Sequence, residues 1–220
     1  DYESASYTST DAGSNNGSDV ANWVFDSARK AGDSAVVTSD SNCYVVVFRS
    51  VGRQEYATKD VRHILFKVDE SALDSEAETY EADLQAAKDA AKAAAEDALA
   101  QWKAGEATED SFAALANELS ADDGSNTNGG LYTKIYKNQM VTEFNDWCFD
   151  ASRQAGDTGI AYGESSNYKG YHVMYFVGDD VPYWQVQAEN ALRNTDTEAW
   201  LDGLLDSADV VQENGMKHVG

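Results

Sequence analysis

Two of the three histidines stand inside hydrophobic, strand-like stretches of the sequence. His63 lies within VRHILFKV and His172 within GYHVMYFV, whereas His218 is close to the C-terminal end. Side chains alternate between the two faces of a strand, so each imidazole shares its face with apolar neighbours two residues away. A lone histidine on such a face is usually a satisfied core residue. Two of them in hydrophobic strands are also candidates for a functional site.

The cysteines do not suggest a metal site. Cys43 and Cys148 are the only two in the chain, which is too few for a disulfide framework. Neither stands in the Cys-x-x-Cys or Cys/His spacing that binds zinc. We therefore expect two unpaired thiols, no metal and no other cofactor.

Composition excludes several classes of partner. The 220 residues carry a formal net charge of −23, with 42% hydrophobic residues. This hydrophobic content predicts a folded chain, while the acidity and the absence of Lys/Arg clusters argue against nucleic acid and anionic membrane surfaces. No apolar run reaches the length of about 18 residues that a membrane-spanning helix needs. We expect no direct membrane insertion of this chain.

The sequence contains an internal repeat. ANWVFDSARKAGDS (21–34) matches NDWCFDASRQAGDT (145–158) at a constant offset, and NCYVVVFRSVG (42–52) aligns with YKGYHVMYFVG (168–178) after a gap of two residues. Each copy predicts a helix, a glycine stop, a turn and a strand. In this alignment Val46 stands where the second copy has His172. The apolar strand YVVVF would expose an unprotected edge, so we expect something to cover it.

The remaining segments predict elements that position the histidines. These are a loop over 1–18, a strand over 61–68, a helix over about 74–104 stopping at Gly105, a helix over DSFAALANELS capped by Thr108 or Asp110, a strand over 131–136, a helix over about 141–155, a strand over 170–177, and a helix over about 183–207 leading into a short strand, ADVVQ.

Five motifs in this order resemble the parvulin-type peptidyl-prolyl isomerases. They are VRHIL, the SFAALANELS helix, the DDGS–NGG loop, QMVTEF and GYH. The resemblance implies an α+β, FKBP-like fold in which helices wrap a small antiparallel sheet with a shallow concave site. We accordingly divide the chain into a degenerate half copy of this domain (1–58), the isomerase domain (59–178) and a C-terminal helical extension (179–220).

The resemblance also implies the polar part of the site. In the family, the histidines of the first and last strands lie side by side beneath the site and hydrogen-bond to each other. Here they are His63 and His172. The third polar residue stands at the start of the loop, where Asp122 aligns and Asp123 is the neighbouring candidate. These residues are expected to act structurally and electrostatically.

The apolar part of the site follows from the same resemblance. Met140 and Phe144 match the side chains that hold the proline ring. Three positions depart from the family pattern: Tyr132 takes the place of an apolar wall residue, Ile135 replaces an aromatic residue, and Lys169 occupies a small-hydroxyl position. The resemblance thus implies substrate contacts from Met140, Phe144, Tyr132 and Ile135 in a narrower or altered pocket.

The implied function is cis-trans isomerisation of Xaa-Pro bonds in unfolded polypeptides. The segment KVDESALDSEAE after the first strand has one Lys and five acidic residues, which disfavours phosphate recognition. The alternatives are a chaperone-like binding module without turnover and a structural surface spacer. The resemblance to exported foldases of the PrsA and SurA type implies an extracytoplasmic location.

Two explanations remain open for the terminal segments. In the first, the PrsA and SurA resemblance implies that residues 1–58 and 179–220 pack on each other as a chaperone module, with Trp184 and Trp200 against the helix of Trp23. Alternatively, the chain is a fragment of a longer protein with two parvulin domains, the first degenerate and cut in half. The direct match of the repeat favours the second explanation.

Overall fold

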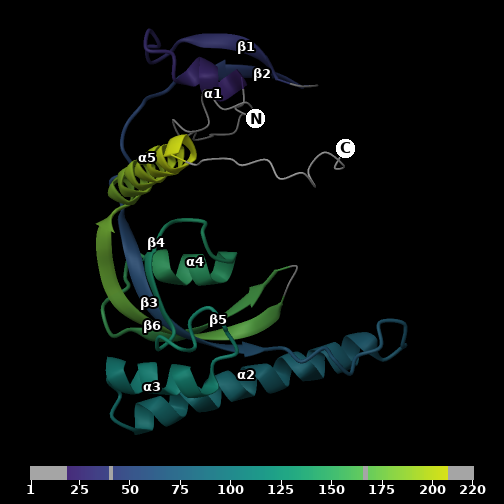
Figure 1. Cartoon of the computed structure of the whole chain (residues 1–220). Helices are drawn as coiled ribbons and strands as arrows, with labels where there is room; N and C mark the ends of the chain where they lie inside the picture. The colour runs from purple at the N-terminus through teal and green to yellow at the C-terminus, as the bar shows by residue number, and fades with distance from the viewer. Residues whose placement is uncertain (1–18, 40–41, 166–167, 208–220) are drawn as a thin grey trace, which may run out of the picture. The chain divides into compact units, whose positions relative to one another are not determined.

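The computed structural model describes residues 19–39, 42–165 and 168–207 (Figure 1). It divides into two compact units, unit 1 (Asp1–Arg53) and unit 2 (Gln54–Gly220). The predicted loop over 1–18, the strand ADVVQ and His218 lie outside the described residues.

Unit 2 is built on a four-stranded antiparallel sheet with the order β4-β3-β6-β5. Its strands are β3 (Ala57–Lys67), β4 (Leu131–Ile135), β5 (Thr158–Glu164) and β6 (Lys169–Pro182). The two long strands, β3 and β6, occupy the centre and carry the two histidines. The mixed α/β architecture with a small antiparallel sheet confirms the predicted fold class.

Helices cover both faces of this sheet (Figure 1). On one face, α2 (Tyr80–Ala104) and α3 (Glu109–Leu119) form a core with Ile64 of β3 and Val173 of β6. On the other face, α4 (Thr142–Phe149) packs with residues that alternate with these, including Val61 and Met174. The alternation follows from the period of two along each strand.

Local sequence signals set the helix ends. Thr108 caps α3, since its hydroxyl accepts from the Ser111 N–H while the Ser111 hydroxyl accepts from the Thr108 N–H. α2 ends at Ala104, before Gly105, as predicted. It begins at Tyr80 rather than near residue 74, because the preceding residues form turns in which Asp74 accepts backbone N–H groups locally.

The C-terminal helix α5 (Tyr183–Ser207) follows β6 directly. Lys134 of β4 forms an ion pair with Glu189 at 2.8 Å, and the Tyr183 ring stacks on Tyr136 and Tyr56. Among the helices of the described residues, none combines the length and apolar character required to cross a bilayer.

Unit 1 contains α1 (Asp19–Val24) and a two-stranded antiparallel sheet of β1 (Ser34–Ser39) and β2 (Asn42–Val47). The prediction of a turn between the helix and the strand of each copy is partly wrong. Part of this stretch forms a strand, β1 in unit 1 and β5 in unit 2. Both strands are short, and the two glycines of TGIAYGE weaken the strand signal in the second copy.

The repeat extends to individual side-chain contacts. Arg29 Nε donates to the Trp23 carbonyl at 3.1 Å with its guanidinium 4.1 Å over the indole ring. Arg153 Nε donates to the Trp147 carbonyl at 3.1 Å and lies 4.0 Å over that ring. The two units therefore share one local structure from helix to hairpin.

The strand register corrects the alignment of the repeat. In unit 1 Val37 pairs with Tyr44, and in unit 2 the corresponding Ala161 pairs with His172. Tyr44, not Val46, is therefore the counterpart of His172. The hairpin of unit 1 is four residues shorter, since Ser39 pairs with Asn42 where Gly163 pairs with Gly170. The sequence alignment allowed a gap of only two residues and therefore misplaced this strand by two positions.

Candidate functional site

The two strand histidines meet at the centre of the unit 2 sheet. His63 of β3 pairs with Met174, and His172 of β6 pairs with Leu65, so the two imidazoles are diagonal neighbours on one face. Their Nδ1 atoms are 3.0 Å apart, and each residue is only 3% exposed. The structure thus brings together the pair that the sequence predicted.

Asp122 continues this contact into a network. Its Oδ2 lies 2.9 Å from His63 Nε2 and accepts hydrogen bonds from the hydroxyls of Ser125 (2.5 Å) and Tyr132 (3.0 Å). The hydrogen bond from His63, followed by those from Ser125 and Tyr132, lowers the pKa of Asp122 in spite of its partial burial. Asp123 is exposed, so Asp122 is the loop carboxylate of this network.

At the other end, the Tyr168 hydroxyl lies 3.1 Å from His172 Nε2. Burial, helped by the neighbouring His63, lowers the pKa of His172 to about 3. The neutral ring has one donor and one acceptor nitrogen. With His172 neutral and the Tyr168 hydroxyl donating to its Nε2, His172 Nδ1–H donates to His63 Nδ1, and His63 Nε2–H donates to the ionised Asp122.

A hollow of about 410 Å³ opens above this network. Met140, Phe144 and Tyr132 line it together with the Asp122–His63–His172 network. The Phe144 ring stands edge-on to both imidazoles, with centroids 5.5 Å from His63 and 5.3 Å from His172. The remaining lining residues are Leu65, Lys67, Gln139, Val141, Ser165 and Tyr168.

Ile135 does not belong to this wall. Its side chain is fully buried in the core cluster beneath the hollow, with Val61 and Phe144 among its neighbours. The expected substrate contact of Ile135 is therefore corrected to a supporting role in the core, because the end of β4 directs this side chain into the packing against α4.

Two glycines allow the backbone to approach the histidines. Gly130 has φ +70°, and a Cβ there would lie 2.2 Å from the His63 carbonyl oxygen. It accepts the His63 N–H at 2.9 Å, which ties the loop of Asp122 to β3. A Cβ at Gly163 would lie 2.8 Å from His172 Nε2, so the ring rests on the bare backbone of β5. Both glycines are required by close contact.

Lys169 points away from the network. Its Nζ pairs with Glu70 at 2.7 Å, and it does not line the hollow. The hydroxyl expected near this position comes instead from the adjacent Tyr168. The family pattern has its hydroxyl at position 169, so no sequence signal pointed to Tyr168. Ser125 was also missed as a partner, although its place three residues after Asp122 is a signal of a local side-chain turn.

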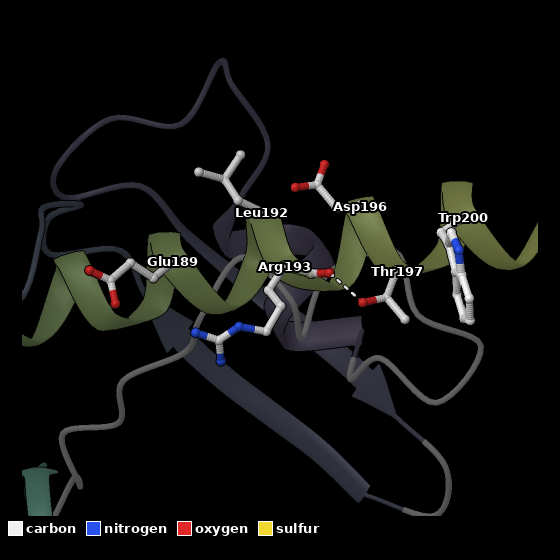
Figure 2. Close-up of a pocket in the computed structure, with 6 residues that line it drawn as sticks. All are labelled: Glu189, Leu192, Arg193, Asp196, Thr197 and Trp200. Atoms are coloured by element: carbon white, nitrogen blue, oxygen red, sulfur yellow. Dashed lines mark hydrogen bonds between the residues drawn. The ribbon is translucent and has the colours of Figure 1, made fainter.

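A second hollow, of about 520 Å³, lies along α5. Figure 2 shows its six lining side chains on that helix, where the Thr197 hydroxyl donates to the Arg193 carbonyl at 2.8 Å. Charged and apolar side chains alternate there without a shared hydrogen-bonded network. In the part of the chain that the structure describes, no group of three His, Cys, Asp or Glu side chains is placed to hold a metal ion.

Comparison with protein families identifies one match. Residues 63–178, just over half of the chain, match the rotamase family described as a PPIC-type PPIASE domain. No curated protein matches the chain.

Several solved structures show low similarity. The peptidylprolyl isomerase PrsA from Bacillus cereus is 23% identical over 73% of this chain and 54% of its own, with a TM-score of 0.38. PrsA from Bacillus anthracis is 19% identical over 73% and 64%, with a TM-score of 0.39. A structure from Campylobacter jejuni, from work on PEB4 and the periplasmic protein Cj1289 as SurA-like chaperones, is 22% identical over 71% and 56%, with a TM-score of 0.37. The chain spans less than two thirds of each.

Proposed function

The chain belongs to the family of PPIC-type peptidyl-prolyl isomerases, and from this premise we propose that unit 2 catalyses cis-trans isomerisation of Xaa-Pro bonds in unfolded polypeptides. One observation carries the proposal: the His63–His172 contact of 3.0 Å, joined to Asp122, forms the floor of a hollow lined by Met140 and Phe144.

The reaction needs no covalent intermediate. Rotation about a peptide bond faces a barrier of about 18–20 kcal/mol, because the C–N bond has partial double-bond character. A site lowers this barrier when it binds the twisted geometry more tightly than either planar isomer. Desolvation of the prolyl ring and a fixed arrangement of polar groups are sufficient for this purpose.

The apolar and polar parts of the hollow divide this work. Met140 and Phe144 hold the prolyl ring on one side of the bond, and the flexible thioether adapts to its shape. The Asp122–His63–His172 network presents a fixed polarity to the bond that turns. The histidines act without a net proton transfer, since their hydrogen bonds to each other and to Asp122 are already satisfied.

Unmodified peptides fit this site better than phosphorylated ones. Among the described residues, Lys67 is the only Lys or Arg that lines the hollow, and two acidic residues, Asp69 and Glu70, follow it closely in the sequence. A phosphate would meet repulsion from these carboxylates. We place the protein outside the cytoplasm as a helper of exported chains, on the basis of its acidic composition and its resemblance to exported foldases. Fractionation of cells that produce it tests this location.

A protease-coupled assay on a Xaa-Pro peptide tests the function. We expect the chain to accelerate isomerisation and His63→Ala to lose most of that acceleration. Glu106→Ala, a surface change outside the hollow, serves as the control. A wild-type rate equal to the uncatalysed rate contradicts the enzyme proposal. Binding of an unfolded, Pro-containing chain without acceleration would then indicate the chaperone-like module, for which Tyr132 in the hollow is the favouring observation.

A further inference from the structure

Unit 1 exposes an apolar sheet face. Val36 of β1 and Val45 and Val47 of β2 are 68%, 81% and 60% exposed, respectively. They share one face, because Val36 pairs with Val45 and Val47 lies two residues further along β2. We call these three residues the valine face. An exposed cluster of large apolar side chains of this kind marks an interaction site.

The repeat shows what covers the same face in unit 2. By strand register, the counterparts of Val36, Val45 and Val47 are Ile160, Val173 and Tyr175. All three belong to, or pack against, the core formed with α2 and α3. Val173 is fully buried there, whereas Val45 is the most exposed residue of the valine face.

The opposite face of the unit 1 sheet is packed as in unit 2. Phe48 is buried at 8% exposure and Val20 of α1 at 4%. Their counterparts, Phe176 of β6 and Phe144 of α4, are buried in one core cluster between that strand and that helix. Unit 1 therefore has the α4-like layer of the fold, and the exposure of the valine face does not come from a shifted register.

The sheet is also incomplete at one edge. In unit 2, β6 pairs with β5 on one side and with β3 on the other. Within the described residues, its counterpart β2 pairs with β1 alone. A free strand edge beside an uncovered apolar face accepts a strand that carries its own covering layer.

We propose that the valine face and the free edge of β2 bind the front half of a parvulin-type domain. This partner segment resembles residues 57–135 of this chain. It consists of a strand that pairs with β2 and two helices whose apolar faces cover the valines. In unit 2 the front half precedes α4 along the chain. The equivalent position in unit 1 is N-terminal to α1, so a front half joined there is the occupant that we propose.

Thiol labelling of Cys43 tests the proposal. Cys43 is exposed on β2 and shares the valine face, because it lies two residues before Val45. Cys148 is the internal reference, since it is buried and burial raises its thiol pKa to about 12. The natural chain is compared with a chain in which a second copy of residues 54–141 replaces residues 1–17. This junction reproduces the one before α4.

We expect fast labelling of Cys43 in the natural chain at every protein concentration, and labelling at least about tenfold slower in the extended chain. Val45→Asp in the extended chain restores fast labelling. Val51→Asp is the matched control, because Val51 is 74% exposed, lies outside the paired strands and leaves labelling slow.

Three outcomes overturn the proposal. Equal labelling rates in the natural and extended chains show that a parvulin front half does not fit. Slow labelling in the natural chain at all concentrations shows that its own residues already cover the face. Slow labelling only at high concentration assigns the face to a second copy of the chain. Deuterium uptake by the peptide containing β2 repeats the comparison without thiol chemistry, and unchanged uptake in the extended chain also overturns the proposal.

Discussion

At the residue scale, the site is a directed chain of hydrogen bonds. Tyr168 donates to His172, His172 to His63, and His63 to Asp122, which also accepts from Tyr132. Two tyrosine hydroxyls thus end a network whose centre is the pair of imidazoles. Since each member fixes the proton position of the next, the polarity at the floor of the hollow depends on both ends.

Removal of one terminal hydroxyl tests this dependence. Burial and the hydrogen bond to Asp122 raise the pKa of Tyr132 to about 12, so it remains a donor at neutral pH. We expect Tyr132→Phe to lower kcat/KM for a Xaa-Pro peptide about tenfold, the effect of losing one hydrogen bond to a charged group.

Tyr136→Phe is the matched control, because Tyr136 stacks on Tyr183 away from the hollow and should leave kcat/KM unchanged. Equal effects of the two substitutions would show that the Tyr132 hydroxyl has no positioning role.

The same network predicts how stability depends on pH. The pKa of His172 is about 3 in the folded chain, below its ordinary value of 6.5. Below pH 6.5 the unfolded chain therefore binds a proton that the folded chain excludes, and the free energy of unfolding decreases as the pH is lowered. We expect the free energy of unfolding to decrease by about 1–3 kcal/mol between pH 6.5 and 4.5.

Urea unfolding at a series of pH values measures this slope. His172→Gln, which cannot titrate, should be less stable at pH 7 and should show a smaller slope over the same interval. An unchanged slope in this variant would assign the pH dependence to other groups.

Sequence alone predicted the polar centre of the site but not its ends. Strand periodicity placed His63 and His172 on defined faces of their strands, whereas their contact and the role of Asp122 were implied by the resemblance to the parvulin family. Tyr168 and Ser125 were missed because their contacts depend on how two loops fold over the sheet, and pattern does not define loop paths.

At the element scale, the loop that carries Asp122 is held to β3 through Gly130. A side chain at this position would meet both strain at φ +70° and the His63 carbonyl oxygen at 2.2 Å. We expect Gly130→Ala to lower the free energy of unfolding by at least about 2 kcal/mol more than backbone strain at a positive φ would alone. The substitution should also reduce isomerase activity, because it displaces Asp122.

Gly156→Ala isolates the strain contribution. Its φ is +90° and a Cβ there would meet nothing within 4 Å, so we expect only about 1–2 kcal/mol of destabilisation and normal activity. Urea unfolding of both variants provides the comparison. Equal destabilisation would show that the loop can move away from β3 at little cost.

Element boundaries show where sequence patterns lose information. The predicted strand over 170–177 extends to Lys169–Pro182, and α4 stops at Phe149 rather than near residue 155. The end of β6 is set by tertiary pairing, since β6 continues opposite Ala57, whereas α4 ends at a local turn in which Asp150 accepts the Ser152 N–H. Propensity does not report such partners.

At the scale of the whole molecule, the two units repeat one structure with different completeness. β1 and β5 are equivalent edge strands, each paired on one side only in the described residues. They differ in how well their sheets are covered. The sheet of β5 is packed on both faces, whereas the sheet of β1 exposes the valine face. This difference makes β5 an internal control for the stability of β1.

Hydrogen exchange on the natural chain measures the difference directly. Local opening of β1 and β2 exposes little additional apolar surface, because Val36, Val45 and Val47 are already exposed. We expect the amides of β1 and β2 to exchange at least about a hundredfold faster than those of β5 and β6. Similar protection in the two hairpins would mean that unit 1 is stable without a covering layer. The incompleteness of its fold would then have no energetic consequence in the natural chain.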